Sequence, residues 1–149
     1  MILLEACYEN KMKKGHVVHN VEEKAFDTIP KLNSDIILII SYVNIGFDSE
    51  TMIANQVWGF SPKESWIEID IDAPVNFKNA FLKLKVETDP GSWRLDRETP
   101  WKAHYNPKTQ WFCVGSLDLE VDDQCIVFLE NAISVLNSSG ELKALWIHL

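Results

Sequence analysis

The sequence predicts a single α+β domain that spans residues 1–149. We expect a mainly antiparallel sheet of about five to seven strands with about two helices packed on it. Three observations predict this fold. Several segments alternate apolar and polar side chains, residues 35–43 form a nearly continuous β-branched run, and residues 122–136 are apolar at helical spacing. With 149 residues, of which 46% are hydrophobic, the chain is long enough to bury a core.

The N-terminal part predicts a strand followed by a short helix. Residues 1–8 are rich in apolar side chains and favour a short strand. Asn20 can cap a helix, because its side chain can accept a hydrogen bond from a first-turn amide. Glu22 and Glu23 would then lie where the helix dipole favours acids. Pro30 is expected to end this helix, because the residue before a proline is pushed out of the helical conformation.

The middle of the chain predicts strands. Residues 35–43 indicate a central strand covered on both faces, because the run has almost no polar interruption. Residues 65–72 and 81–87 alternate strictly, which is typical of an antiparallel hairpin with one solvent-facing side. The acids of the first segment and the lysines of the second would be neighbours across that hairpin, so the acidic row needs no metal. Residues 109–114 predict another strand.

The C-terminal stretch gives the clearest structural pattern. Residues 122–136 predict a helix that packs across one face of the sheet, with Asp122 and Asp123 as its capping and first-turn acids. Residues 137–140 contain polar residues and a glycine that would end the helix. Residues 142–149 then predict a final strand.

Residues 88–110 are the least regular part of the sequence. They hold three prolines, one glycine, two tryptophans, both arginines and a histidine within 23 residues. A long irregular segment inside a compact domain is uncommon without a function. Trp93, Arg97 and Trp101 are therefore candidate partner-binding residues, since tryptophan and arginine are enriched at binding hot spots. The alternative is a loop pinned to the core by its tryptophans. Its arginines would then pair with Asp89, Asp96 or Glu98.

No motif of known chemistry is present. His16 and His19 form an H-x-x-H, but no further zinc ligands stand beside them, so we expect no metal. The sequence also lacks a nucleophile elbow, a phosphate-binding loop and a dinucleotide fingerprint. We therefore name no catalytic residue and expect no cofactor, which leaves open whether the protein is an enzyme. Cys7, Cys113 and Cys125 are expected to be reduced core residues.

The net charge of −8 bears on the possible partners. Nonspecific nucleic-acid binding needs a basic surface, so we expect no nucleic-acid partner. No apolar run approaches the roughly 18 residues of a membrane span, and the first residues lack the pattern of a secretory leader. These features predict a cytoplasmic protein with no membrane partner.

The acidic charge is concentrated toward the C-terminus. Between Lys108 and Lys143 the sequence contains no Lys, Arg or His. A surface of this kind can dock a basic protein with fast, salt-sensitive association. The candidate partner-binding acids in this span are Asp118, Glu120, Asp122 and Asp123.

In size, in acidity and in its lack of a secretory leader and of catalytic motifs, the chain resembles the small immunity proteins of bacterial toxin–immunity pairs. The resemblance implies a non-enzymatic inhibitor that masks a basic, nuclease-like toxin domain. Two alternatives remain open. One is a small-molecule-binding protein or enzyme with a pocket near residues 88–110, and the other is a structural or interaction subunit. The sequence does not determine the oligomeric state.

Overall fold

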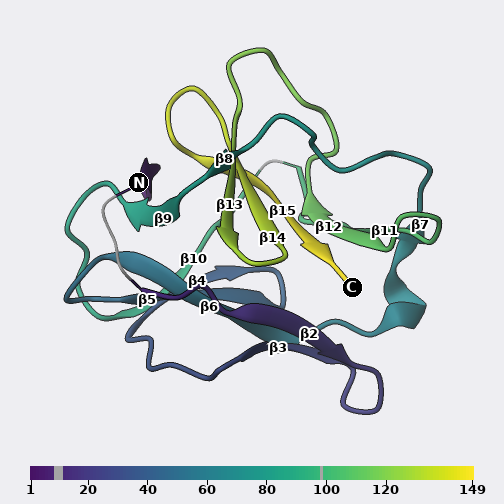
Figure 1. The fold of residues 1–149 in the computed structure, drawn as a ribbon, viewed down its shortest axis with the longest axis horizontal. Helices are drawn as coiled ribbons and strands as arrows, with labels where there is room; N and C mark the ends of the chain where they lie inside the picture. The colour runs from purple at the N-terminus through teal and green to yellow at the C-terminus, as the bar shows by residue number, and fades with distance from the viewer. Residues whose placement is uncertain (9–11, 98) are drawn as a thin grey trace.

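The computed structural model describes residues 1–8, 12–97 and 99–149. Figure 1 shows a protein built from two β-sheets, with β2 to β6 in the lower half and β11 to β15 above them. The predicted α+β architecture with two helices is wrong. In the described part of the chain, the one helical element is the three-residue 3-10 turn η1 (Lys63–Ser65). Among the described residues, no helix is long and apolar enough to cross a membrane.

The first sheet, sheet A, has eight strands. They are β1 (Leu4–Cys7), β2 (His16–Asn20), β3 (Ala25–Ile29), β4 (Ile36–Ile40), β5 (Val43–Asp48), β6 (Ile53–Phe60), β9 (Phe81–Leu84) and β10 (Gly91–Arg94). Their order is β1-β9-β6-β5-β4-β10, and β3 joins β6 and carries β2 as a branch. All pairs are antiparallel except β10 with β4, which is parallel.

The second sheet, sheet B, has seven strands. They are β7 (Ile67–Glu68), β8 (Lys78–Asn79), β11 (Ala103–Asn106), β12 (Trp111–Gly115), β13 (Gln124–Leu129), β14 (Ala132–Leu136) and β15 (Leu142–His148). Their order is β7-β11-β12-β15-β14-β13-β8. The five long strands pair antiparallel, whereas the two-residue strands β7 and β8 join the edges in parallel.

The main core lies between the two sheets. Phe26 and Phe47 of sheet A are fully buried in it, together with Phe112 and Phe128 of sheet B. A second apolar cluster lies on the other face of sheet B and is centred on Trp146. Side chains alternate along a strand, so β12 contributes Phe112 to the first cluster and its neighbour Cys113 to the second.

This burial on both faces explains why the predicted helix at residues 122–136 is wrong. The segment forms the hairpin β13–β14, and all five residues of β14 are buried. With both faces covered, the strands carry apolar residues at nearly every position, and a period of two is no longer visible. Residues 142–149 form β15 as predicted.

The predicted helix near Asn20 is also wrong. Asn20 does accept a hydrogen bond from the Glu23 amide, at 3.0 Å, but the capped segment is a turn between β2 and β3. Lys24 ends the turn with a φ of 56°, which a helix does not allow. Asn20 therefore caps a turn, as its residue type predicts. The segment after the turn is a strand rather than a helix, because it pairs with β2.

The middle strands are only partly as expected. Residues 35–43 contain β4, a turn at Ser41 with a φ of 61°, and the start of β5, and the side chains of β4 alternate in burial. The predicted hairpin of residues 65–72 with 81–87 is wrong, because β7 joins β11 in sheet B while β9 joins β1 in sheet A. The short strand within residues 1–8 and the strand at residues 109–114 are confirmed as β1 and β12.

Candidate functional site

The segment that joins β12 to β13, residues 116–123, is called the acidic loop below. It rises as a light-green loop at the top of Figure 1. The loop starts after Gly115, which has a φ of 116°; a Cβ there would lie 2.4 Å from the Lys143 carbonyl oxygen. The Ser116 amide donates to that same oxygen at 3.0 Å. The loop is therefore fixed to β15 at its first residue.

Asp123 fixes the other end of the acidic loop. Its carboxylate forms an ion pair with the Lys143 ammonium group, and the two side chains are only 2% and 13% exposed. The same carboxylate accepts a hydrogen bond from the Glu120 amide at 2.9 Å, and the Asp123 amide donates to the Glu120 carbonyl at 3.1 Å. The side chain of Asp123, one of the predicted partner-binding residues, thus points inward and positions the loop.

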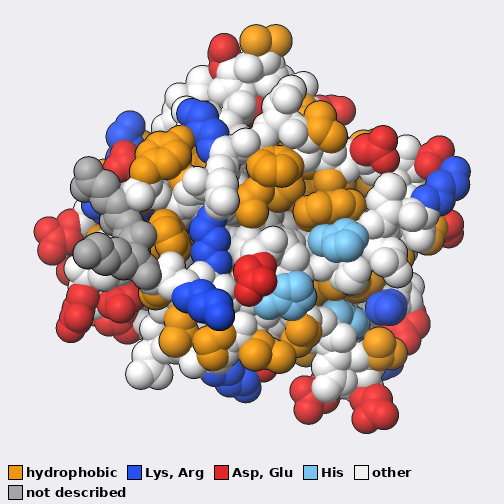
Figure 2. Space-filling model, in the orientation of Figure 1, with side chains coloured by type: hydrophobic (Ala, Val, Ile, Leu, Met, Phe, Trp, Pro, Cys, Tyr) orange, Lys and Arg blue, Asp and Glu red, His pale blue; other side chains and the backbone are white. Residues whose placement is uncertain are grey.

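The other three predicted acids lie on the surface of the acidic loop. Asp118, Glu120 and Asp122 are exposed, and none takes part in an ion pair with a described cationic group. Leu119 is 50% exposed and Val121 is fully exposed. Acidic and hydrophobic side chains meet at the top of the molecule in Figure 2, where this loop lies. The loop therefore alternates free carboxylates with aliphatic groups.

Residues 88–110 do not form an irregular loop throughout, because they contain β10 and β11. With the N-terminal residues and the β14–β15 turn, they line an open groove of about 760 Å³, called the arginine groove below. The residues that bear on its chemistry are Trp93, Arg94, Asp96, Arg97, Trp101, Glu141 and Lys143.

The three predicted residues of this stretch do meet in the arginine groove. The Arg97 guanidinium lies 4.6 Å from the centre of the Trp101 ring, and its Nη1 donates to the Lys143 carbonyl at 2.8 Å. The Trp101 indole donates to the Leu95 carbonyl at 2.7 Å. Trp93 is 40% exposed, and its indole donates to the Asp89 carbonyl. Trp101 is therefore pinned, as the packed-loop alternative predicts, whereas Trp93 stays accessible.

The predicted ion pairs of the arginines with Asp89 or Asp96 are not formed. Neither Arg94 nor Arg97 forms an ion pair with a carboxylate of the described residues, including Asp89 and Asp96. Glu98, the third candidate acid, lies outside the described residues.

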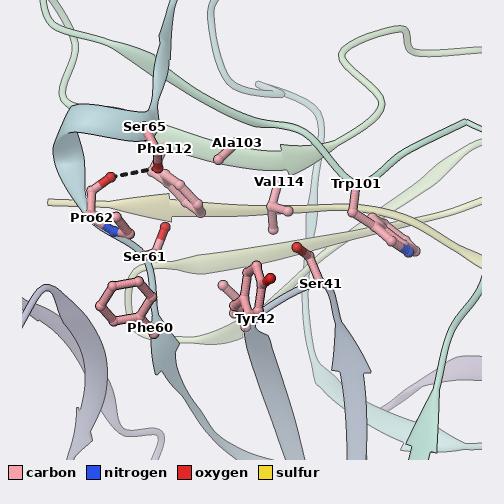
Figure 3. Close-up of a pocket in the computed structure, with 11 residues that line it drawn as sticks. Ser41, Tyr42, Phe60, Ser61, Pro62, Ser65, Trp101, Ala103, Phe112 and Val114 are labelled. Carbon is pink, nitrogen blue, oxygen red and sulfur yellow. Dashed lines mark hydrogen bonds between the residues drawn. The ribbon is translucent and has the colours of Figure 1, made fainter.

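A smaller pocket of about 290 Å³ opens between the sheets, next to Trp101 (Figure 3). Aromatic side chains of Tyr42, Phe60 and Phe112 line it, together with the hydroxyls of three serines. Ser61 accepts a hydrogen bond from the Trp66 indole at 2.8 Å, and Ser65 donates to a backbone carbonyl. Trp101 and Ala103 come from residues 88–110, near which the small-molecule alternative expects a pocket. The other lining residues lie in segments far apart in the chain and could not be named from the sequence.

His19, Cys113 and Cys125 serve packing in this structure. His19 lies among aromatic rings, 4.8 Å from Phe26 and 5.0 Å from Trp66, and its Nε2 contacts the Ser61 carbonyl. Burial raises the pKa of the thiols of Cys113 and Cys125, which keeps them protonated and unreactive. Within residues 1–8, 12–97 and 99–149, no group of three or more His, Cys, Asp or Glu side chains could hold a metal ion.

No protein-family model matches this chain, and no curated protein is significantly similar to it in sequence. The functional argument therefore depends on the acidic loop, the arginine groove and the pocket between the sheets.

Proposed function

We propose that this protein is a non-enzymatic binding domain that docks a basic protein partner through the acidic loop. An immunity or inhibitor protein that masks a basic, nuclease-like toxin domain would act in this way. The observation that carries the proposal is the alternation of Asp118, Glu120 and Asp122 with the exposed Leu119 and Val121. The carboxylates would steer a basic surface toward the loop, and the aliphatic side chains would supply apolar contact area.

The anchoring of the acidic loop supports the same function. Ordering a flexible segment on binding costs conformational entropy, which reduces affinity. Here the contacts of Ser116 and Asp123 with Lys143 fix both ends of the loop before any partner arrives. The exposed acids between those ends can therefore be presented in one arrangement.

The test is a triple charge reversal, Asp118→Lys, Glu120→Lys and Asp122→Lys. A partner is first identified by affinity purification with mass spectrometry, and its affinity for each purified variant is then measured at low and high salt. We expect the loop variant to bind at least about tenfold more weakly and to lose most of the salt dependence. The matched control reverses three exposed acids elsewhere, Glu22, Glu23 and Glu87. Unchanged affinity of the loop variant, or an equal loss in the control, would contradict the proposal.

A second candidate function is the binding of a small aromatic or aliphatic molecule in the pocket beside Trp101. The pocket's aromatic lining and its opening to solvent favour this alternative. Titration with indole, followed by NMR, should then shift the amide resonances of Ala103 and Val114. The variant Ala103→Leu should abolish those shifts by filling the pocket, whereas shifts that persist in it would place the indole elsewhere.

A further inference from the structure

The two arginines of the chain, Arg94 and Arg97, both line the arginine groove. The chain carries 22 acidic residues, yet neither arginine forms an ion pair with a described carboxylate. Asp96, Glu141 and Lys143 also line the groove. Lys143 forms its ion pair with Asp123. Within the described residues, these two cationic groups, Arg94 and Arg97, therefore have no carboxylate partner, in a groove of a strongly acidic protein.

Arg97 is already held in a fixed position. Its guanidinium stacks over Trp101 and donates one hydrogen bond to the Lys143 carbonyl. A guanidinium has five N–H donors in a rigid plane, so most of its donors stay available. Such a fork matches the two oxygens of a carboxylate better than a lysine ammonium does.

The groove also borders an edge of sheet A that no described strand covers. β10 is the last strand of sheet A beyond β4. The Gly91 amide donates to the Asp35 carbonyl at 2.8 Å, and the Leu95 amide donates to the Ile39 carbonyl at 2.9 Å. Hydrogen-bonding direction alternates along a strand, so the backbone groups of Ser92 and Arg94 point away from β4. These groups can accept another strand.

We infer that the arginine groove binds an extended, acidic peptide segment of a partner protein, which adds as a strand to the free edge of β10. The backbone of the segment would pair with Ser92 and Arg94. Its carboxylates would meet Arg94 and Arg97, and an apolar side chain would cover the exposed ring of Trp93. Main-chain pairing supplies affinity in this mode, and side-chain contacts supply specificity.

Charge argues against two other occupants. A second copy of this chain that paired β10 with β10 would add two further arginines to the groove rather than carboxylates, so it would not neutralise Arg94 and Arg97. Single-stranded nucleic acid also stacks on tryptophan and binds arginine, but the net charge of −8 opposes its phosphates. An acidic peptide brings only a few charges, and Arg94 and Arg97 can neutralise them.

The inference does not depend on the acidic loop. It uses β10 and the residues that follow it, whereas the loop lies between β12 and β13. The triple charge reversal in the loop makes the protein less acidic and should therefore not weaken binding of an acidic peptide, so the two proposals can fail separately.

The probe is a capped synthetic peptide of alternating valine and glutamate, titrated into the full-length protein and followed by NMR. We expect the largest shifts at the Ser92 and Arg94 amides and at the Trp93 indole. Arg94→Gln should weaken binding about tenfold or more, because it removes charge-assisted hydrogen bonds from an exposed side chain. The matched control is Lys63→Gln, which removes an exposed positive charge on the η1 turn and should change nothing.

Two further peptides separate strand addition from simple charge attraction. The same sequence with every amide N-methylated keeps its carboxylates but cannot donate main-chain hydrogen bonds from either edge, and it should not bind. The sequence with lysine in place of glutamate should not bind either. Equal binding of either peptide, shifts centred away from β10, or tighter binding of a single-stranded oligonucleotide would overturn the inference.

Discussion

Asp123 and its neighbours in the acidic loop show how burial changes the role of a carboxylate. Asp123 and Asp122 are adjacent in the chain, but only the side chain of Asp123 is shielded from solvent, and it is paired with Lys143. In a buried pair each charge compensates the desolvation of the other, so removing one partner leaves an uncompensated charge. An exposed carboxylate is solvated by water and contributes little to stability.

The first prediction at this scale concerns that ion pair. Asp123→Asn should destabilise the protein by about 1–3 kcal/mol, because the part-buried Lys143 charge loses its counter-charge. The double variant Asp123→Leu with Lys143→Met should recover most of the loss, since apolar groups of similar size need no counter-charge. Urea unfolding measures both values. Asp122→Asn is the matched control and should change stability by less than about 0.5 kcal/mol; a comparable loss there would contradict this account.

At the scale of elements, the hairpin β13–β14 depends on one side chain at its turn. Buried Asn131 accepts a hydrogen bond from the Val17 amide at 2.8 Å and donates to the carbonyls of Val17 and His148 at 2.8 and 2.7 Å. It therefore joins β2 of sheet A to the hairpin and to β15 of sheet B. The predicted helix over this segment was wrong because such contacts, between residues 114 positions apart, cannot be seen in local periodicity.

Replacing Asn131 tests this connection. Asn131→Ala should cost about 2–4 kcal/mol, because it leaves one amide and two carbonyls without partners where water has little access. Hydrogen exchange should also become faster in β2, at the Val17 amide. Asn76→Ala is the control, since Asn76 is exposed. If both variants unfold at the same urea concentration as the wild type, the bridge between the sheets is not a determinant of stability.

At the scale of the whole molecule, the two sheets bring together groups that are distant in the chain. The arginine groove combines Met1 and Ile2 with Trp93 and Glu141. The sequence singled out the tryptophans and arginines by their type, and the structure brings Trp93, Arg97 and Trp101 into this one groove. The groove itself could not be predicted, because the other residues that line it come from the N-terminus and the β14–β15 turn.

Some features follow from the sequence alone. The composition requires a buried core, and the segments now seen as β1, β12 and β15 were recognisable as strands. The absence of cationic residues between Lys108 and Lys143 leaves the acids of the acidic loop without a cationic neighbour in the sequence. These are local properties of composition and alternation, which do not depend on what lies opposite in space.

Tertiary structure alone decided the rest. Whether residues 122–136 became a helix or a hairpin depended on coverage of both faces of sheet B, which removes the alternation that marks a strand. The fold also decided which acids a partner can reach. Asp122 and Asp123 have the same side chain, but only that of Asp123 is shielded from water and paired with Lys143. The free edge of β10 likewise exists only because sheet A ends there.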